Sequence, residues 1–186
     1  MPDFPILFTN PIMSKIPYNL SKIRAIVFDV DGVLSPTTVP MSPEGVPQRM
    51  ANLKDGYAMV TAIKNGLHLA IISGADTRSI IGRFAPIGLH DVYLGVLDKL
   101  PVLKEYMESK GLSPDEVAYI GDDIPDIPCL KHVGLAVTPR DGAQECKDVA
   151  TYITLADGGY GVAREVVEEV LKAQNLWPVT GQANGR

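Results

Sequence analysis

The sequence lacks the features of membrane-spanning, secreted or disulfide-bonded proteins. No apolar run approaches the roughly 18 residues of a membrane span. The apolar residues 4–8 follow an acid and contain proline, unlike a signal peptide. The only cysteines, Cys129 and Cys146, form no CxxC pair and no metal-ligand spacing with histidine. These absences predict free thiols, a cytoplasmic location and no membrane partner.

Basic residues are too few and too scattered for a nucleic-acid-binding face. Seventeen Lys and Arg stand against 22 Asp and Glu, which gives a net charge of -5. A protein that binds a phosphate backbone needs a clustered basic surface. We therefore expect no nucleic-acid partner, although a metal ion and a few local cations would still allow an anionic substrate.

The chain is long enough for one domain with a substantial core, since it has 186 residues, of which 46% are hydrophobic. We predict an N-terminal extension over residues 1–20, a folded domain over residues 21–177 and a flexible tail over residues 178–186, because this last stretch is rich in small and polar residues.

Short apolar runs alternate with helical patterns along the domain. The expected strands are residues 24–28, 67–72, 91–94, 117–120, 134–137 and 150–154. The expected helices are residues 55–65, 77–84, 98–110, 124–132, 143–147 and 162–174. This alternation predicts an α/β fold, a Rossmann-like parallel sheet with helices on both faces.

One segment, residues 35–52, departs from the alternation. It is rich in proline, threonine and glycine, and two short strand-like pieces flank the turn Ser42-Pro43-Glu44-Gly45. Its turn chemistry predicts a small β-hairpin that projects from the sheet, with a plain surface loop as the alternative.

Polar residues follow the predicted strands at the edge where ligands gather in open parallel sheets. They are Asp29, Asp31 and Gly32 after the first strand, Ser73 and Gly74 after the second, Lys99 at the start of the helix after the third, and Asp122 and Asp123 after the fourth. Each piece alone is more often a turn, a loop or a solvated lysine. Carboxylates gathered in this way usually need a hard cation, and ligands that are all oxygen favour Mg²⁺.

The same residues could transfer a phosphoryl group. A metal-bound carboxylate such as Asp29 can attack phosphorus and form an aspartyl-phosphate. Asp31, two residues on, can protonate the leaving oxygen and then deprotonate water. Ser73 and the Gly74 amide can donate hydrogen bonds to phosphoryl oxygens, and Lys99 can neutralise the charge of the transferred group.

Four segments resemble the four motifs of the haloacid dehalogenase superfamily of phosphotransferases, over most of residues 24–140. They are Phe28-Asp29-Val30-Asp31-Gly32-Val33-Leu34, Ile72-Ser73-Gly74, Lys99 and Gly121-Asp122-Asp123-Ile124-Pro125-Asp126. The resemblance implies Asp29 as nucleophile and Asp31 as general acid and base. It implies Mg²⁺ held by the Asp29 carboxylate, the Asp31 main-chain carbonyl and Asp122, with Asp123 and Asp126 orienting the metal site. Ser73 and Lys99 would hold the phosphate.

The chain leaves no room for the lid domain that many members of this superfamily carry, because only residues 35–52 follow the first motif. The segments Asn52-Leu53-Lys54-Asp55-Gly56-Tyr57 and Gly158-Gly159-Tyr160-Gly161-Val162-Ala163-Arg164-Glu165 are similar to parts of the 3-deoxy-D-manno-octulosonate 8-phosphate phosphatases. That capless, tetrameric branch closes its sites with neighbouring subunits. The resemblance implies a homotetramer, a small phosphorylated sugar acid as substrate and a role in lipopolysaccharide biosynthesis.

The chain departs from this branch near the substrate. Ala75 stands where the branch often has arginine, and Lys54 stands where arginine is common. We expect Lys54 and Arg78 either to contact a substrate carboxylate or to be solvated surface cations. A phosphatase for nine-carbon, sialic-acid-type sugar 9-phosphates, a non-catalytic tetramerising module and a phosphatase that acts on a protein stay open as alternatives.

Overall fold

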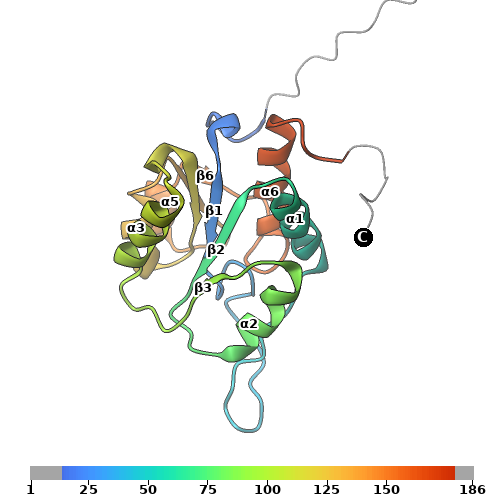
Figure 1. Ribbon diagram of the computed structural model, residues 1–186. Coiled ribbons are helices and arrows are strands. Elements are labelled where there is room, and N and C mark those ends of the chain that lie inside the picture. Colours follow the sequence, from blue (N-terminus) through green and yellow to red (C-terminus); the bar gives the residue numbers. More distant parts are fainter. Residues whose placement is uncertain (1–13, 179–186) are drawn as a thin grey trace, which may run out of the picture.

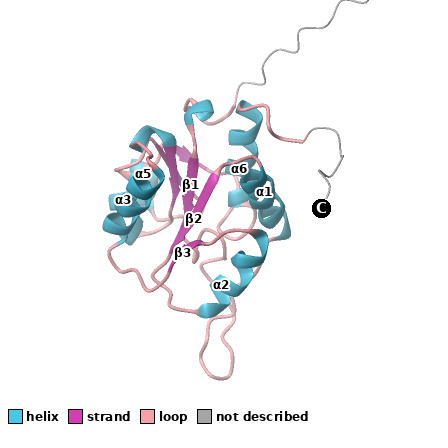
Figure 2. Ribbon diagram, in the orientation of Figure 1, coloured by secondary structure: helices cyan, strands magenta, loops and turns pink. Residues whose placement is uncertain are grey.

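Six parallel strands form one sheet at the centre of the computed structural model, which describes residues 14–178 (Figures 1 and 2). The strands lie in the order β3-β2-β1-β4-β5-β6, and every neighbouring pair is parallel. Their bounds are β1 Ala25–Phe28, β2 His68–Ile72, β3 Asp91–Tyr93, β4 Val117–Ile120, β5 Leu135–Thr138 and β6 Tyr152–Ile153. The chain reverses its direction of travel across the sheet next to β1, between β1 and β4. That switch point is where open α/β sheets bind their ligands.

Helices cover both faces of the sheet, as the alternating pattern predicts. One layer holds α1 (Leu53–Lys64), α2 (Arg78–Phe84) and α6 (Val162–Ala173), and the other holds α3 (Lys99–Lys110), α4 (Ile127–Leu130) and α5 (Gln144–Val149). Successive side chains of β1 enter opposite cores: Ile26 and Phe28 lie in the first, and Ala25 and Val27 in the second. A strand buried on both sides needs apolar residues at every position, which explains the unbroken apolar runs.

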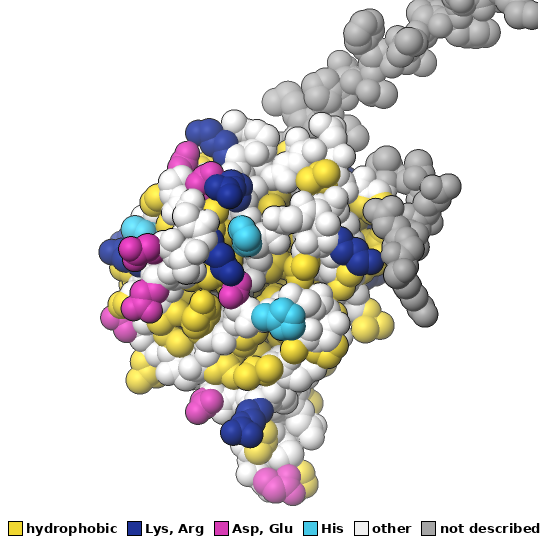
Figure 3. Space-filling view, viewed as in Figure 1, with side chains coloured by type: hydrophobic (Ala, Val, Ile, Leu, Met, Phe, Trp, Pro, Cys, Tyr) yellow, Lys and Arg dark blue, Asp and Glu magenta, His cyan; other side chains and the backbone are white. Residues whose placement is uncertain are grey.

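Short 3₁₀ turns complete the chain at η1 (Leu20–Lys22), η2 (Ala85–Ile87), η3 (Pro114–Glu116) and η4 (Ile124–Asp126). None of the helices described is long and apolar enough to cross a membrane. On the face seen in Figure 3, Lys and Arg side chains are scattered among Asp and Glu rather than gathered in a patch.

The folded part begins earlier than residue 21. Ile16 and Leu20 are each 2% exposed and belong to the core on the side of α1 and α6. Residues 14–20 of the predicted extension therefore pack against the domain. The rest of that extension, residues 1–13, and residues 179–186 of the predicted tail lie outside the described part of the chain.

The predicted β-hairpin at residues 35–52 forms no regular strands. It is a loop that projects beyond α2 (Figure 1) and is closed by one antiparallel bridge between Met41 and Pro47. Its turn is held by hydrogen bonds from the Ser42 amide to the Val46 carbonyl and from the Gln48 amide to the Pro40 carbonyl. The prolines in the segment have no N–H to donate, so a ladder cannot extend from this bridge.

Candidate functional site

The carboxyl ends of β1, β2 and β4 open into one cavity of about 430 Å³. The loops after these strands, the start of α3 and the loop 35–52 supply its walls. The residues that line it are Asp29, Asp31, Thr37, Arg49, Ser73, Gly74, Ala75, Val96, Leu97, Lys99, Asp122, Asp123, Pro125 and Asp126. Most of the residues that the sequence singles out therefore meet at one place.

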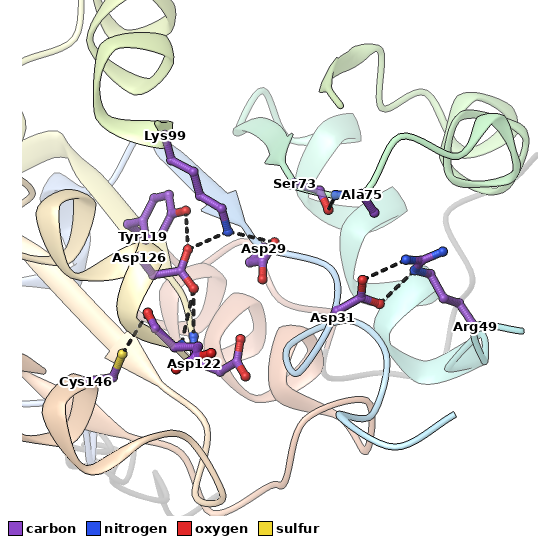
Figure 4. A network of polar contacts seen from close by, with 11 residues as sticks. Asp29, Asp31, Arg49, Ser73, Ala75, Lys99, Tyr119, Asp122, Asp126 and Cys146 are labelled. Carbon is purple, nitrogen blue, oxygen red and sulfur yellow. Dashed lines mark hydrogen bonds and ion pairs between the residues drawn. The ribbon is translucent and has the colours of Figure 1, made fainter. Parts of the chain in front are cut away.

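Asp29 lies at the floor of the cavity, directly after β1. Its amide donates to the Ile120 carbonyl at 2.9 Å, which holds it beside β4. The Nζ of Lys99, at the first position of α3, lies 3.0 Å from Asp29 Oδ1 (Figure 4). Burial and repulsion from Asp126 raise the pKa of Asp29 to about 7, and Lys99 offsets part of that rise.

Asp126 joins the strands and helices around the site. Its Oδ1 accepts from Lys99 Nζ and from the Tyr119 hydroxyl, each at 2.7 Å (Figure 4). Its Oδ2 accepts from the backbone amides of Asp122 and Asp123, at 3.1 and 3.4 Å. A carboxylate has about four acceptor positions, and four donors occupy them here. Asp126 is therefore better placed to orient its neighbours than to bind a ligand itself.

Three buried carboxylates come together in this cavity. One oxygen each from Asp29, Asp122 and Asp126 lies within 4.8 Å of the others. Burial, and then repulsion from Asp29, Asp126 and Asp123, raises the pKa of Asp122 to about 8. Such a cluster is costly unless a cation balances it, and its donors are all oxygen. The residues thus fit a hard divalent cation, with Asp29 and Asp122 still free to offer oxygens.

Asp31 lies nearer the mouth of the cavity, with its side chain 46% exposed. Its two carboxylate oxygens accept from Nε and Nη2 of Arg49, both at 2.7 Å. Across the cavity, Ser73 Oγ accepts the Ala75 amide at 3.2 Å. Among the described residues the Ser73 hydroxyl donates to no acceptor, so its hydrogen can point to a ligand.

The remaining predicted residues are further from the centre. Asp123 is exposed, and its Oδ1 accepts its neighbour's amide, from Ile124, at 2.8 Å at the start of η4. Lys54 and Arg78 are exposed and do not line the cavity. Lys54 lines a second cavity, near Gly159 and Tyr160. The structure therefore does not bring these two cations into the cavity of the carboxylates, and their contact with substrate stays a prediction.

Two residues of the site were not predicted from the sequence. In the sequence, Tyr119 has the pattern of a core residue within an apolar strand, and no neighbouring residue indicates that its hydroxyl takes part in the site. Arg49 had a weak signal, because it is the only basic residue between Ser35 and Asn52. A lone cation in the segment after the first motif could have been predicted to pair with an acid of that motif.

Comparison with known proteins agrees with the family resemblance seen in the sequence. Residues 86–166 match the family of haloacid dehalogenase-like hydrolases. The 3-deoxy-D-manno-octulosonate 8-phosphate phosphatase of Escherichia coli K12 is 34% identical over 165 residues, which is 89% of this chain and 88% of that protein.

Solved structures of similar proteins share the fold. The enzyme of the same name from Yersinia pestis superposes with a TM-score of 0.81 at 34% identity, over 84% of this chain and 85% of that one. The Moraxella catarrhalis enzyme, solved with magnesium, phosphate and the sugar acid KDO, gives a TM-score of 0.80 at 32% identity, over 84% and 90%. The chain therefore belongs to the haloacid dehalogenase-like hydrolases, in the branch of the 3-deoxy-D-manno-octulosonate 8-phosphate phosphatases.

Proposed function

We propose that this protein is a Mg²⁺-dependent phosphatase that hydrolyses 3-deoxy-D-manno-octulosonate 8-phosphate to the free sugar acid and phosphate. The observation that carries the proposal is the buried cluster of Asp29, Asp122 and Asp126 beside Lys99, in a chain that is 34% identical to enzymes with that activity. An anionic phosphate could not approach such a cluster unless a cation balanced its charge.

Mg²⁺ would be held by the Asp29 carboxylate, the Asp31 carbonyl and Asp122. When bound, it supplies positive charge to the phosphoryl oxygens and to the carboxylates around them. Asp126 accepts hydrogen bonds from the backbone amides of Asp122 and Asp123, which precede η4, and so fixes the loop that carries Asp122. Asp123 is the N-cap residue of η4, and its role is to hold the conformation of that loop.

The chain's own groups divide the remaining work. Asp29 attacks phosphorus and becomes the aspartyl-phosphate while the bond to the sugar oxygen breaks. Asp31 gives its proton to that oxygen and later takes one from the water that releases phosphate. Lys99 and the Ser73 hydroxyl stabilise the phosphoryl oxygens, and the Gly74 amide lies on the same wall of the cavity.

A nine-carbon sugar 9-phosphate is the second candidate substrate. Ala75 keeps this candidate open, because it lines the cavity with a methyl group that offers no charge to select one sugar acid over another. A homotetramer whose neighbours cover the cavity, and a cytoplasmic location, stay predictions that fit the missing lid and the free, buried cysteines.

A phosphate-release assay with Mg²⁺ tests the function. The substrates are octulosonate 8-phosphate, a neuraminate-type 9-phosphate and glucose 6-phosphate, with Asp29→Asn as the inactive variant and the exposed Asp148→Asn as its matched control. We expect kcat/KM for the octulosonate ester to exceed the others by about tenfold or more, and only Asp29→Asn to abolish turnover. Phosphate release from none of the esters would favour a non-catalytic module instead.

A further inference from the structure

Arg49 reaches into the site from the loop 35–52. Its guanidinium forms a two-pronged contact with Asp31, Nε to Oδ1 and Nη2 to Oδ2, both at 2.7 Å (Figure 4). Two parallel hydrogen bonds fix the plane of a carboxylate as well as its distance. The loop therefore determines how the Asp31 side chain is oriented at the mouth of the cavity.

The burial of this pair is unequal. The Arg49 side chain is only 11% exposed, although its neighbours Gln48 and Met50 are exposed, while the Asp31 side chain is 46% exposed. Arg49 Nη1 is buried and has no hydrogen-bond partner among the described residues. An arginine held this way loses hydration and side-chain freedom, so the contact with Asp31 must outweigh both.

We propose that Arg49 is a positioning residue for the reaction and acts through Asp31. The inference rests on the proposed function, in which Asp31 is the acid and base. Without Arg49, a half-exposed aspartate would sample several rotamers in solvent. With it, the side chain is held at the mouth of the cavity that Asp29 also lines, so Asp31 needs only to release one of its two contacts before it transfers a proton.

The two-pronged contact must loosen for Asp31 to deliver a proton. Both oxygens are engaged in the structure, and the acid step needs one of them free to carry the O–H. As the Asp29 oxygen bonds to phosphorus and the ester bond breaks, the Asp31 proton passes to the sugar oxygen. Asp31 is then a carboxylate again, which Arg49 can hold while it accepts a proton from water.

The choice of leaving group tests this inference. A sugar phosphate releases an alkoxide that needs a proton, whereas p-nitrophenyl phosphate releases a stable phenolate that does not. The value of kcat/KM reports the steps up to release of the alcohol, so a group that acts through the acid affects only the first ester. The variants are Arg49→Ala, Arg49→Lys, Asp31→Asn and the double variant. Arg24→Ala is the control, because it removes an arginine that pairs with a different acid, Glu116.

We expect Arg49→Ala to lower kcat/KM for the sugar phosphate by about 10- to 100-fold and for the nitrophenyl ester by less than about threefold. Lysine should recover part of the loss, because it can keep one contact but not the pair. Asp31→Asn should show the same dependence on leaving group, and adding Arg49→Ala to it should cost little more.

Three results would overturn the inference. Equal losses on both esters would indicate a structural role, a rise in KM alone would indicate a contact with substrate, and no change would show an idle ion pair. The melting temperature of each variant separates these results from misfolding. If wild-type protein hydrolysed neither ester, the proposed function would fail first and the role of Arg49 with it.

Discussion

Gly32 shows how closely a single residue determines the shape of the site. Its φ is +84°, a backbone conformation that residues with a side chain rarely adopt, and a Cβ at this position would overlap the Asp122 carboxylate. The missing side chain lets the loops after β1 and β4 touch, so that Asp122 reaches Asp29.

Replacing Gly32 by alanine should therefore abolish activity by displacing Asp122. Gly45, at the tip of the loop 35–52, is the matched control, since its φ is +79° and a Cβ there meets no atom within 4 Å. Both changes should cost about 1 kcal/mol of stability from backbone strain. Only Gly32→Ala should reduce kcat, by about 100-fold or more, since a displacement of an ångström at a catalytic group has that effect. Phosphate release and urea unfolding of the two variants measure this, and equal activity would contradict it.

Predictability differed from residue to residue within the site. Asp29, Asp31, Ser73, Lys99 and Asp122 could be found because parallel strand ends share an edge, which a sequence reveals once the strands are located. Tyr119 and Arg49 could not be assigned. A buried tyrosine looks the same whether or not its hydroxyl binds an acid, and the path of an irregular loop is not coded by periodicity.

The joint between α1 and α6 depends on a buried acid. Asp55, in the first turn of α1, accepts the backbone amide of Arg164 at 2.7 Å, at the start of α6. Its other oxygen is buried without a hydrogen-bond partner among the described residues. Burial is the largest cause that raises the pKa of Asp55 to about 6, against the opposing effects of the Arg164 amide, Arg83 and Arg164.

This shift predicts a pH dependence of stability. In the unfolded chain the pKa of Asp55 has its ordinary value of 3.8, whereas burial in the folded protein raises this pKa to about 6. The folded state thus binds more protons between these values, and its free energy of unfolding falls as pH rises through that window, by up to about 3 kcal/mol. Asp55→Asn keeps the acceptor for Arg164 and removes this contribution.

Urea unfolding of wild type and Asp55→Asn at several pH values, at one protein concentration, isolates the effect. Other titrating groups are common to both proteins and cancel in the difference. The wild type should lose stability relative to the variant between roughly pH 4 and pH 6, and the difference should be flat above that range. A constant difference across the whole range would show that folding does not shift the pKa of Asp55.

Regular elements were easier to predict than the loop between them. β4 has the predicted bounds, and β1 and α6 differ from prediction by one residue. Burial on both faces makes each of these strands a continuous apolar run, and burial of one face gives α6 a helical period. In the loop 35–52 the turn was identified, but its strands were wrong, since proline removes the donors that a ladder needs. The packing of Ile16 on the core was missed because a short apolar segment between prolines has no period to recognise.

In the domain as a whole, the feature that lowers stability most is a cluster of buried carboxylates at one edge of the sheet. Asp29, Asp122 and Asp126 share a small buried volume, and Lys99 is the one cation in the described part of the chain that forms ion pairs with any of them. The two hydrophobic cores provide stability on either face, and the carboxylate cluster reduces it. Such a trade is common where function needs charges close together.

Asp122→Asn should stabilise the protein when Mg²⁺ is absent and leave it less stable than wild type when Mg²⁺ is bound. The amide has almost the shape of the carboxylate but no charge, so above the Asp122 pKa of about 8 and with chelator present, the variant should melt a few degrees higher than wild type. Saturating Mg²⁺ should raise the melting temperature of wild type by several degrees, because a ligand stabilises the state that binds it. The variant has lost a ligand, so Mg²⁺ should raise its melting temperature far less, and the wild type should then melt at the higher temperature.

Differential scanning fluorimetry with EDTA and with MgCl₂ measures both melting temperatures. Glu108→Gln, on an exposed part of α3, controls for loss of one negative charge. A wild type that melts at the same temperature in both buffers would mean that these carboxylates do not hold the ion, because binding and stability are linked.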